Sequence, residues 1–84
     1  MAFVVVLTES AAREVRKLDK SVRERIISKL QHYAMHENLS AAKRLGDESL
    51  GTWRYRIGDW RVVFDMNGKE LQILKVAHRS EVYE

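Results

Sequence analysis

Three arginines, Arg54, Arg56 and Arg61, have the type and spacing to bind a phosphate group from one face of a β-hairpin. They lie in two segments, WRYRI and WRVVF, that flank Gly58-Asp59, a favourable hairpin loop because glycine adopts a positive φ at low cost. Strand side chains alternate between faces, so this loop sets Arg56 opposite Arg61. Like charges directly opposite each other destabilise a sheet. The face that carries these arginines, named here the arginine face, is therefore expected to bind an anion, and phosphate is the usual ligand of clustered arginines.

The alternate positions of the same hairpin form the expected core face. They are Trp53, Tyr55, Ile57, Trp60, Val62 and Phe64. A second turn at Asn67-Gly68 leads into a last strand over 70–76, in which Leu71 and Ile73 face the core opposite Phe64 and Val62. Without a bulge, parity places four residues of this last segment on the arginine face: Gln72, Leu74, Val76 and His78.

The N-terminal half predicts a strand followed by two helices. Residues 3–7 form an apolar run typical of a buried strand, Thr8 can cap a first helix, and residues 21–24 match a capping box that starts a second. Residues 37–52 read as a polar connection. The predicted fold class is α+β, in the order β-α-α-β-β-β, with an N-terminal helical hairpin packed on one face of a small, mainly antiparallel twisted sheet. The arginine face is expected to stay open.

Length and composition narrow the function classes. Eighty-four residues make one domain, 1–84, and the absence of cysteine excludes disulfides and thiolate chemistry. No apolar run approaches the roughly 20 residues of a membrane span, and the N-terminus lacks the basic region of a signal peptide, so we expect a cytoplasmic protein that does not contact a membrane. The net charge of +3 favours an anionic partner only slightly.

The acidic residues and histidines do not predict a metal site. Aspartate and glutamate are scattered along the chain, and His32 and His36 have i, i+4 spacing without an evident third ligand. We therefore interpret both histidines as surface residues and expect neither a metal nor a cofactor.

Two motifs make the chain resemble the RelE/ParE toxin superfamily. They are YRIGDWRVVF at residues 55–64 and HRSEVY at residues 78–83, preceded by KRL at residues 43–45. The resemblance covers essentially the whole chain and implies the toxin of a type II toxin–antitoxin pair. RelE-type members cut mRNA in the ribosomal A site through attack of a ribose 2′-OH on the adjacent phosphate, whereas ParE-type members poison DNA gyrase. The HRSEVY ending is more similar to the RelE branch.

The resemblance implies roles for the three hairpin arginines. Arg61 matches the phosphate-contacting arginine of the family, and Arg54 and Arg56 stand where some members have two lysines. An arginine cannot deprotonate, so here these positions offer charge and hydrogen bonds rather than a general base. The alternative for Arg61 is a structural pairing with Asp59 or Asp65.

The resemblance also extends the site to the C-terminal segment. Arg79 matches the arginine of the family's tail, and His78 competes for that position. His78 is either a general acid or base or a solvated strand end. Tyr83 matches a terminal tyrosine that stacks on or near the target base; the alternative is a tail aromatic packed on the sheet. Lys43 and Arg44 either extend an RNA-binding surface or are solvated loop charges.

The resulting hypothesis is a ribosome-dependent mRNA endoribonuclease that inhibits translation without a metal. The alternatives are a ParE-like gyrase poison without nuclease activity and a catalytically inactive relative that binds only its antitoxin. The expected partners are the ribosome, mRNA and a cognate antitoxin that is small, acidic and partly disordered alone. Operator DNA is expected to be bound only indirectly, through the antitoxin complex.

Overall fold

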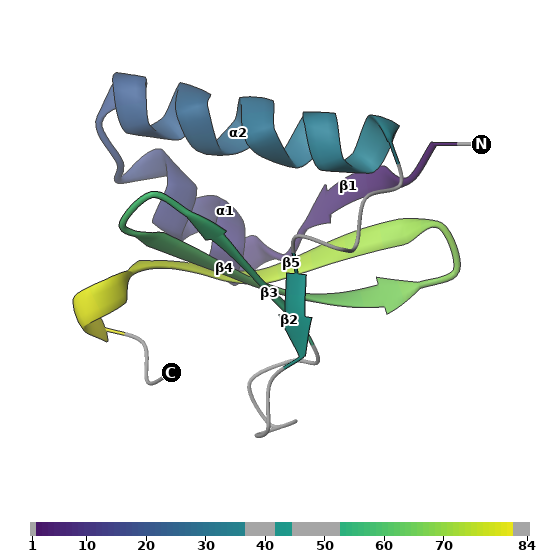
Figure 1. Ribbon diagram of the computed structural model, residues 1–84. Coiled ribbons are helices and arrows are strands. Elements are labelled where there is room, and N and C mark those ends of the chain that lie inside the picture. Colours follow the sequence, from purple (N-terminus) through teal and green to yellow (C-terminus); the bar gives the residue numbers. More distant parts are fainter. Residues whose placement is uncertain (1, 37–41, 45–52, 82–84) are drawn as a thin grey trace.

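The computed structural model describes residues 2–36, 42–44 and 53–81, which form a five-stranded sheet with two helices on one face (Figure 1). The elements are β1 Val4–Leu7, α1 Glu9–Arg16, α2 Lys20–Met35, β2 Ala42–Arg44, β3 Trp53–Ile57, β4 Trp60–Asn67, β5 Glu70–His78 and the 3₁₀ turn η1 Arg79–Glu81. The spatial order is β1-β5-β4-β3-β2. β1 runs parallel to β5, and the other neighbouring pairs are antiparallel. The predicted fold class is confirmed, and β2 is an additional strand within the segment expected to be a connection.

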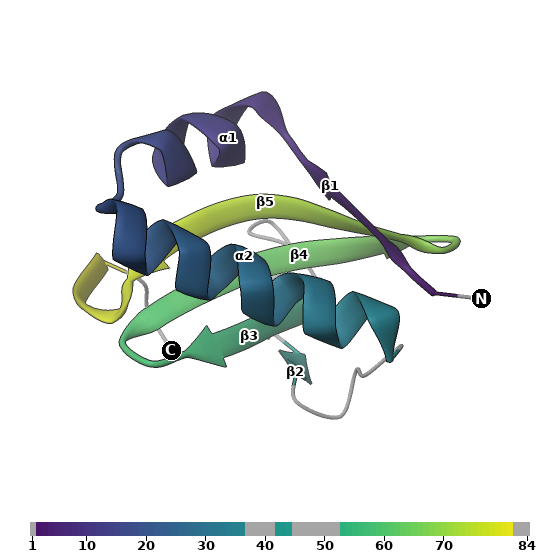
Figure 2. The ribbon, with the colours of Figure 1, turned by 90° about the horizontal axis from the view of Figure 1, so that it is seen from above.

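The two helices begin where short polar residues end the preceding segment. The Oγ1 of Thr8 accepts a hydrogen bond from the backbone N–H of Ala11 at 3.1 Å, so the predicted cap of α1 is confirmed. α2 begins at Lys20 with Asp19 as its N-cap residue, so the predicted start at the capping box is wrong: Ser21, the expected N-cap, lies two positions later, inside the helix. Figure 2 shows α2 lying across β3 and β4 while α1 lies beside β5. No helix in the described ranges is both long and apolar enough to span a membrane.

The core lies between the helices and the predicted core face of the hairpin. Its fully buried side chains come from both layers: Ala11, Ile26 and Leu30 from the helices and Tyr55, Val62, Phe64, Leu71 and Ile73 from the strands. Tyr33, Tyr55 and Phe64 stack in series, with ring centroids 4.3 and 4.6 Å apart. Burial raises the pKa of Tyr55 to about 12, and the neighbouring Tyr33 adds to the shift.

A β-bulge changes the expected register between β4 and β5. Phe64 pairs with Ile73 but Val63 pairs with Lys75, so Leu74 is an extra residue on β5. The predicted pairing of Ile73 with Val62 and of Leu71 with Phe64 is therefore wrong. The observed partners are Val62 with Val76, Phe64 with Ile73 and Met66 with Leu71.

The bulge also reverses which face the end of β5 presents. Val76 lies in the core opposite Val62, and His78 lies opposite Trp60. Both residues therefore lie on the helix-covered face, not on the arginine face as parity without a bulge predicts. Gln72, which precedes the bulge, pairs with Asp65 and keeps its predicted face.

Where β1 ends, the side chain of Glu14 in α1 binds the edge of β5 in its place. The last backbone bond from this side runs from the Thr8 N–H to the Ile73 carbonyl at 3.0 Å. Beyond it, the Oε1 of Glu14 accepts the Val76 N–H at 2.9 Å, and its Oε2 pairs with the Lys75 ammonium at 3.4 Å. A helix side chain thus fixes the strand segment that leads to His78 and η1.

Candidate functional site

The β3–β4 hairpin forms with the predicted register. Ile57 pairs with Trp60 and Arg56 pairs with Arg61, across a turn in which Gly58 has φ +60°. The neighbouring positions on each strand are core residues, so alternation places Arg54, Arg56 and Arg61 together on the face away from the helices. The prediction that the three arginines share one face of the hairpin is therefore confirmed.

The arginine face is not open at every position, which corrects the expectation from the sequence. The exposed fractions of Arg54 and Arg61 are 6% and 3%, and Val63 between them on the same face is also buried. Arg56 is exposed. Strand alternation places Arg54 and Arg61 on the face away from the core residues that pack against the helices, so helix packing does not account for their burial. Of the three hairpin arginines, Arg56 is therefore the one whose side chain is exposed to solvent.

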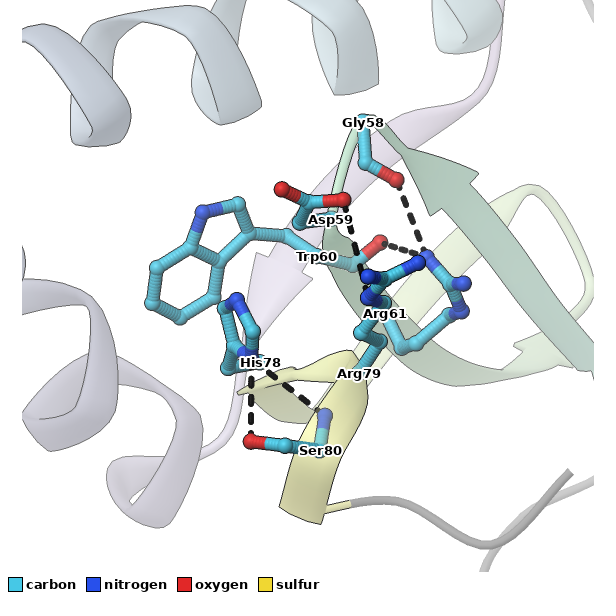
Figure 3. Close-up of polar contacts among 7 residues, drawn as sticks. All are labelled: Gly58, Asp59, Trp60, Arg61, His78, Arg79 and Ser80. Atoms are coloured by element: carbon cyan, nitrogen blue, oxygen red, sulfur yellow. Dashed lines mark hydrogen bonds and ion pairs between the residues drawn. The ribbon is translucent and has the colours of Figure 1, made fainter.

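Arg61 folds back onto the turn that precedes it (Figure 3). Its Nη1 donates hydrogen bonds to the carbonyl oxygens of Gly58 and Trp60, each at 3.0 Å. A buried charge needs such hydrogen bonds to offset its desolvation. The guanidinium of Arg61 therefore has a structural role at the end of the hairpin.

Arg79 is attached to the same turn from the other end of the chain. Its backbone N–H donates to the carbonyl oxygen of Asp59 at 2.8 Å, and its Nε lies 3.7 Å from the Asp59 Oδ1 (Figure 3). Both side chains are more than half exposed, so this ion pair is weak and open to competition by another anion. Arg79 thus lies beside the turn that Arg61 supports.

His78 does not join these arginines. Its ring lies perpendicular to the Trp60 ring, with centroids 5.4 Å apart, on the helix-covered side of the sheet. Its Nδ1 lies 3.0 Å from the Ser80 Oγ and accepts the Ser80 N–H at 3.3 Å (Figure 3). In this arrangement the neutral ring carries its proton on Nε2. The bulge at Leu74, which the sequence did not reveal, is the reason for this placement.

The other candidate residues are only partly described. β2 pairs Lys43 with Arg54 and Arg44 with Trp53 along the backbone, whereas Tyr83 lies outside the described residues. His32 and His36 are exposed, with ring centroids 4.5 Å apart. Within ranges 2–36, 42–44 and 53–81, no group of three or more histidine, cysteine or acidic side chains is arranged to hold a metal.

Another arginine, Arg25, lies at this end of the hairpin, and the sequence did not predict its position. The guanidinium of Arg25, from α2, covers Gly58, with Nη2, Nη1 and Cζ at 2.9, 3.0 and 3.1 Å from the position that a Cβ on Gly58 would occupy. In the sequence Arg25 is one of several charges on the surface of a helix, and nothing in its spacing signals a contact with the hairpin.

Comparison with known proteins places this geometry in a family. The family described as the ParE toxin of the type II toxin–antitoxin system parDE matches residues 5–83. The chain belongs to this family. The toxin is also similar to an Escherichia coli protein whose name describes it as RelE-like, at 29% identity over 99% of this chain and 92% of the relative. The resemblance to the RelE/ParE superfamily is confirmed, with names from both branches among the relatives.

Solved structures agree with the fold. The toxin is similar to a chain of the RelBE2 toxin–antitoxin complex of Mycobacterium tuberculosis, with a TM-score of 0.73 and 26% identity over 94% of this chain and all of that one. It is similar in fold to a chain of the archaeal RelE–RelB complex of Pyrococcus horikoshii, with a TM-score of 0.76 and 20% identity over 98% of this chain and all of that one.

Proposed function

We propose that this toxin is a ribosome-dependent mRNA endoribonuclease. The observation that supports the proposal best is the convergence of arginines on the Gly58–Asp59 turn. Arg61 donates to the turn's carbonyl, Arg79 is bonded to Asp59, and Arg56 stands opposite Arg61 across the hairpin. Asp59 is the carboxylate within the turn itself, so the hairpin end carries an excess of positive charge that suits an RNA phosphate.

The proposed reaction needs charge more than it needs a strong base. The ribose 2′-oxygen forms a bond to the adjacent phosphorus, the bond from phosphorus to the 5′-oxygen breaks, and the products are a 2′,3′-cyclic phosphate and a 5′-OH. The proton leaves the 2′-OH, and the departing 5′-oxygen gains one. Guanidinium groups stabilise the extra negative charge on the phosphorane oxygens but do not accept the proton. This division of labour fits an enzyme whose RNA is aligned by the ribosome.

The arginines differ in solvent exposure, and we infer different roles for the buried and the exposed side chains. Arg56 and Arg79 are exposed and can contact a phosphate directly. Arg61 is buried and bonded to the turn, so it fixes the hairpin end against which the phosphate would lie. Arg54 is buried further along β3, and its charge acts on the same face at a greater distance from the turn.

Primer extension on translating ribosomes tests the proposal. Wild-type toxin is expected to cut mRNA in the A site, and Arg56→Ala to cut about 10²-fold more slowly, the scale for loss of one group that stabilises transition-state charge. Arg13→Ala, on the exposed surface of α1, is the matched control and should cut normally. Absence of cutting by folded wild-type protein, or full activity of Arg56→Ala, contradicts the assignment.

The second candidate is a gyrase poison without nuclease activity. It is favoured by the match to the ParE family and by the burial of Arg54 and Arg61. A supercoiling assay with purified gyrase separates the two functions. The gyrase candidate predicts inhibition by the wild type and by Arg56→Ala alike, together with no cleavage of A-site codons.

We also propose a cognate antitoxin as the partner, because the similar solved chains come from toxin–antitoxin complexes. The toxin's net charge of +3 favours an antitoxin segment rich in aspartate and glutamate that folds on binding. Any contact with operator DNA would run through that complex. Growth arrest on expression, relieved by co-expression of a small acidic neighbour, is the expected result; expression without arrest would indicate a non-toxic relative.

A further inference from the structure

Arg25 places its guanidinium directly over Gly58 of the hairpin turn. Its Nη2, Nη1 and Cζ lie 2.9, 3.0 and 3.1 Å from the position that a Cβ on Gly58 would occupy, so a side chain at Gly58 would collide with the guanidinium. Only glycine leaves room for this contact. A guanidinium carries five N–H donors, and those that are not turned toward the glycine can reach other acceptors.

No acidic group neutralises this arginine in the part of the chain that the structure describes. Arg25 takes no part in the ion pairs that join Lys20 to Glu24, Lys75 to Glu14, and Arg79 to Asp59. Arg25 is exposed, so its rim is accessible to a ligand from solvent. The turn therefore carries an uncompensated positive charge on its α2 side.

Arg25 and Arg79 approach the same two-residue turn from different elements. Arg25 comes from α2 and lies over Gly58, whereas Arg79 begins η1 and contacts Asp59. Arg56 adds a third exposed guanidinium on β3, one residue before Ile57 at the start of the turn. A polyanion that crosses the hairpin tip would meet one guanidinium after another.

We propose that Arg25 is an RNA-binding residue that contacts a phosphate next to the one held by Arg56 and Arg79. The inference rests on the proposed nuclease function for the position of the first phosphate. It extends the RNA path from the arginine face over the Gly58–Asp59 turn toward α2. A diester oxygen can accept hydrogen bonds from the N–H groups of the exposed Arg25 guanidinium. The Arg25 side chain binds RNA through charge and position, with no part in the reacting atoms.

A structural role is the competing explanation, because an arginine in this position also covers a glycine turn. The two explanations differ in what they predict for Arg25→Gln. A purely packing role predicts lower stability with unchanged RNA affinity. An RNA-binding role predicts weaker RNA affinity that depends less steeply on salt, with little change in stability.

The test measures binding of a fluorescent, 2′-O-methylated single-stranded RNA by anisotropy, so that cleavage does not interfere. Arg25→Gln should weaken binding about fivefold at about 50 mM salt and lower the slope of log affinity against log salt by about 0.7, the value for one lost phosphate contact on a single strand. Lys29→Gln is the matched control: it removes one charge from an exposed residue one turn along the same helix. It should bind within about twofold of the wild type, as a charge outside the contact does.

Equal losses for Arg25→Gln and Lys29→Gln would show only a general effect of net charge and overturn the inference. Competition by polyglutamate as strong as by unlabelled RNA would also overturn it, in favour of an acidic peptide. The experiment also distinguishes failure of the Arg25 contact from failure of the proposed nuclease function. If wild-type toxin does not cut mRNA on ribosomes but Arg25→Gln still weakens RNA binding, the nuclease is wrong and the RNA contact stands.

Discussion

Replacing Arg61 with alanine should destabilise the toxin, in addition to any effect on activity. The side chain is only 3% exposed, and its Nη1 bonds the carbonyls of Gly58 and Trp60. Losing a hydrogen bond from a charged donor costs about 1.5–3 kcal/mol, and each buried methylene adds about 0.8 kcal/mol. With two methylenes removed, we expect a loss of about 3–5 kcal/mol, a large fraction of the 5–15 kcal/mol of a typical domain.

Urea unfolding followed by tryptophan fluorescence measures this change, because Trp60 lies next to the altered residue. Arg56→Ala removes the same group from the exposed position directly opposite and should stay within about 0.5 kcal/mol of the wild type. If Arg61→Ala costs no more than Arg56→Ala, the buried guanidinium does not support the turn and the reasoning is wrong. The expected result also means that activity lost in Arg61→Ala is informative only for protein shown to be folded.

Three further predictions concern the elements that hold the site. Glu14→Ala leaves the Val76 N–H without its side-chain acceptor and should speed hydrogen exchange at that amide by about tenfold or more. Unchanged exchange would show that Glu14 does not fix β5. The Tyr55 pKa of about 12 in the folded protein lies above the unfolded value of about 10, so the free energy of unfolding should fall by about 2–3 kcal/mol as the pH rises from about 10 to about 12. In parallel urea titrations, Tyr55→Phe should lack this loss. Thr8→Ala should lower the free energy of unfolding by about 1 kcal/mol through loss of the bond to the Ala11 N–H, and an unchanged urea midpoint would exclude a capping role.

Local rules predicted the hairpin and its core. A two-residue loop with glycine fixes the register, and strand alternation then sorts Tyr55, Val62 and Phe64 to the buried side without knowledge of the rest of the chain. The cap of α1 is local in the same sense, because Thr8 and Ala11 are three residues apart. These features could be read from sequence because each depends on neighbours within one turn or one hairpin.

Features set by distant contacts could not be predicted. The bulge at Leu74 lies where β1 ends and Glu14 of α1 bonds the strand edge, and it is what moved His78 to the helix-covered side. The contact of Arg25 with Gly58 depends on how α2 lies over the hairpin. The burial of Arg61 likewise depends on packing and not on charge pattern. β2 is three residues long and gave no periodic signal in a polar segment.

The parallel pairing of β1 with β5 has a consequence for the timing of toxicity. β1 is an edge strand, and its residues from Val4 to Leu7 align with Glu70 to Ile73, near the other end of the chain. The first strand to be synthesised must therefore wait for the last, and contacts this far apart in sequence form slowly. Until β5 has been made and has folded onto it, β1 has no neighbour in the sheet. This delay is an interval in which the antitoxin proposed above would meet an incompletely folded chain.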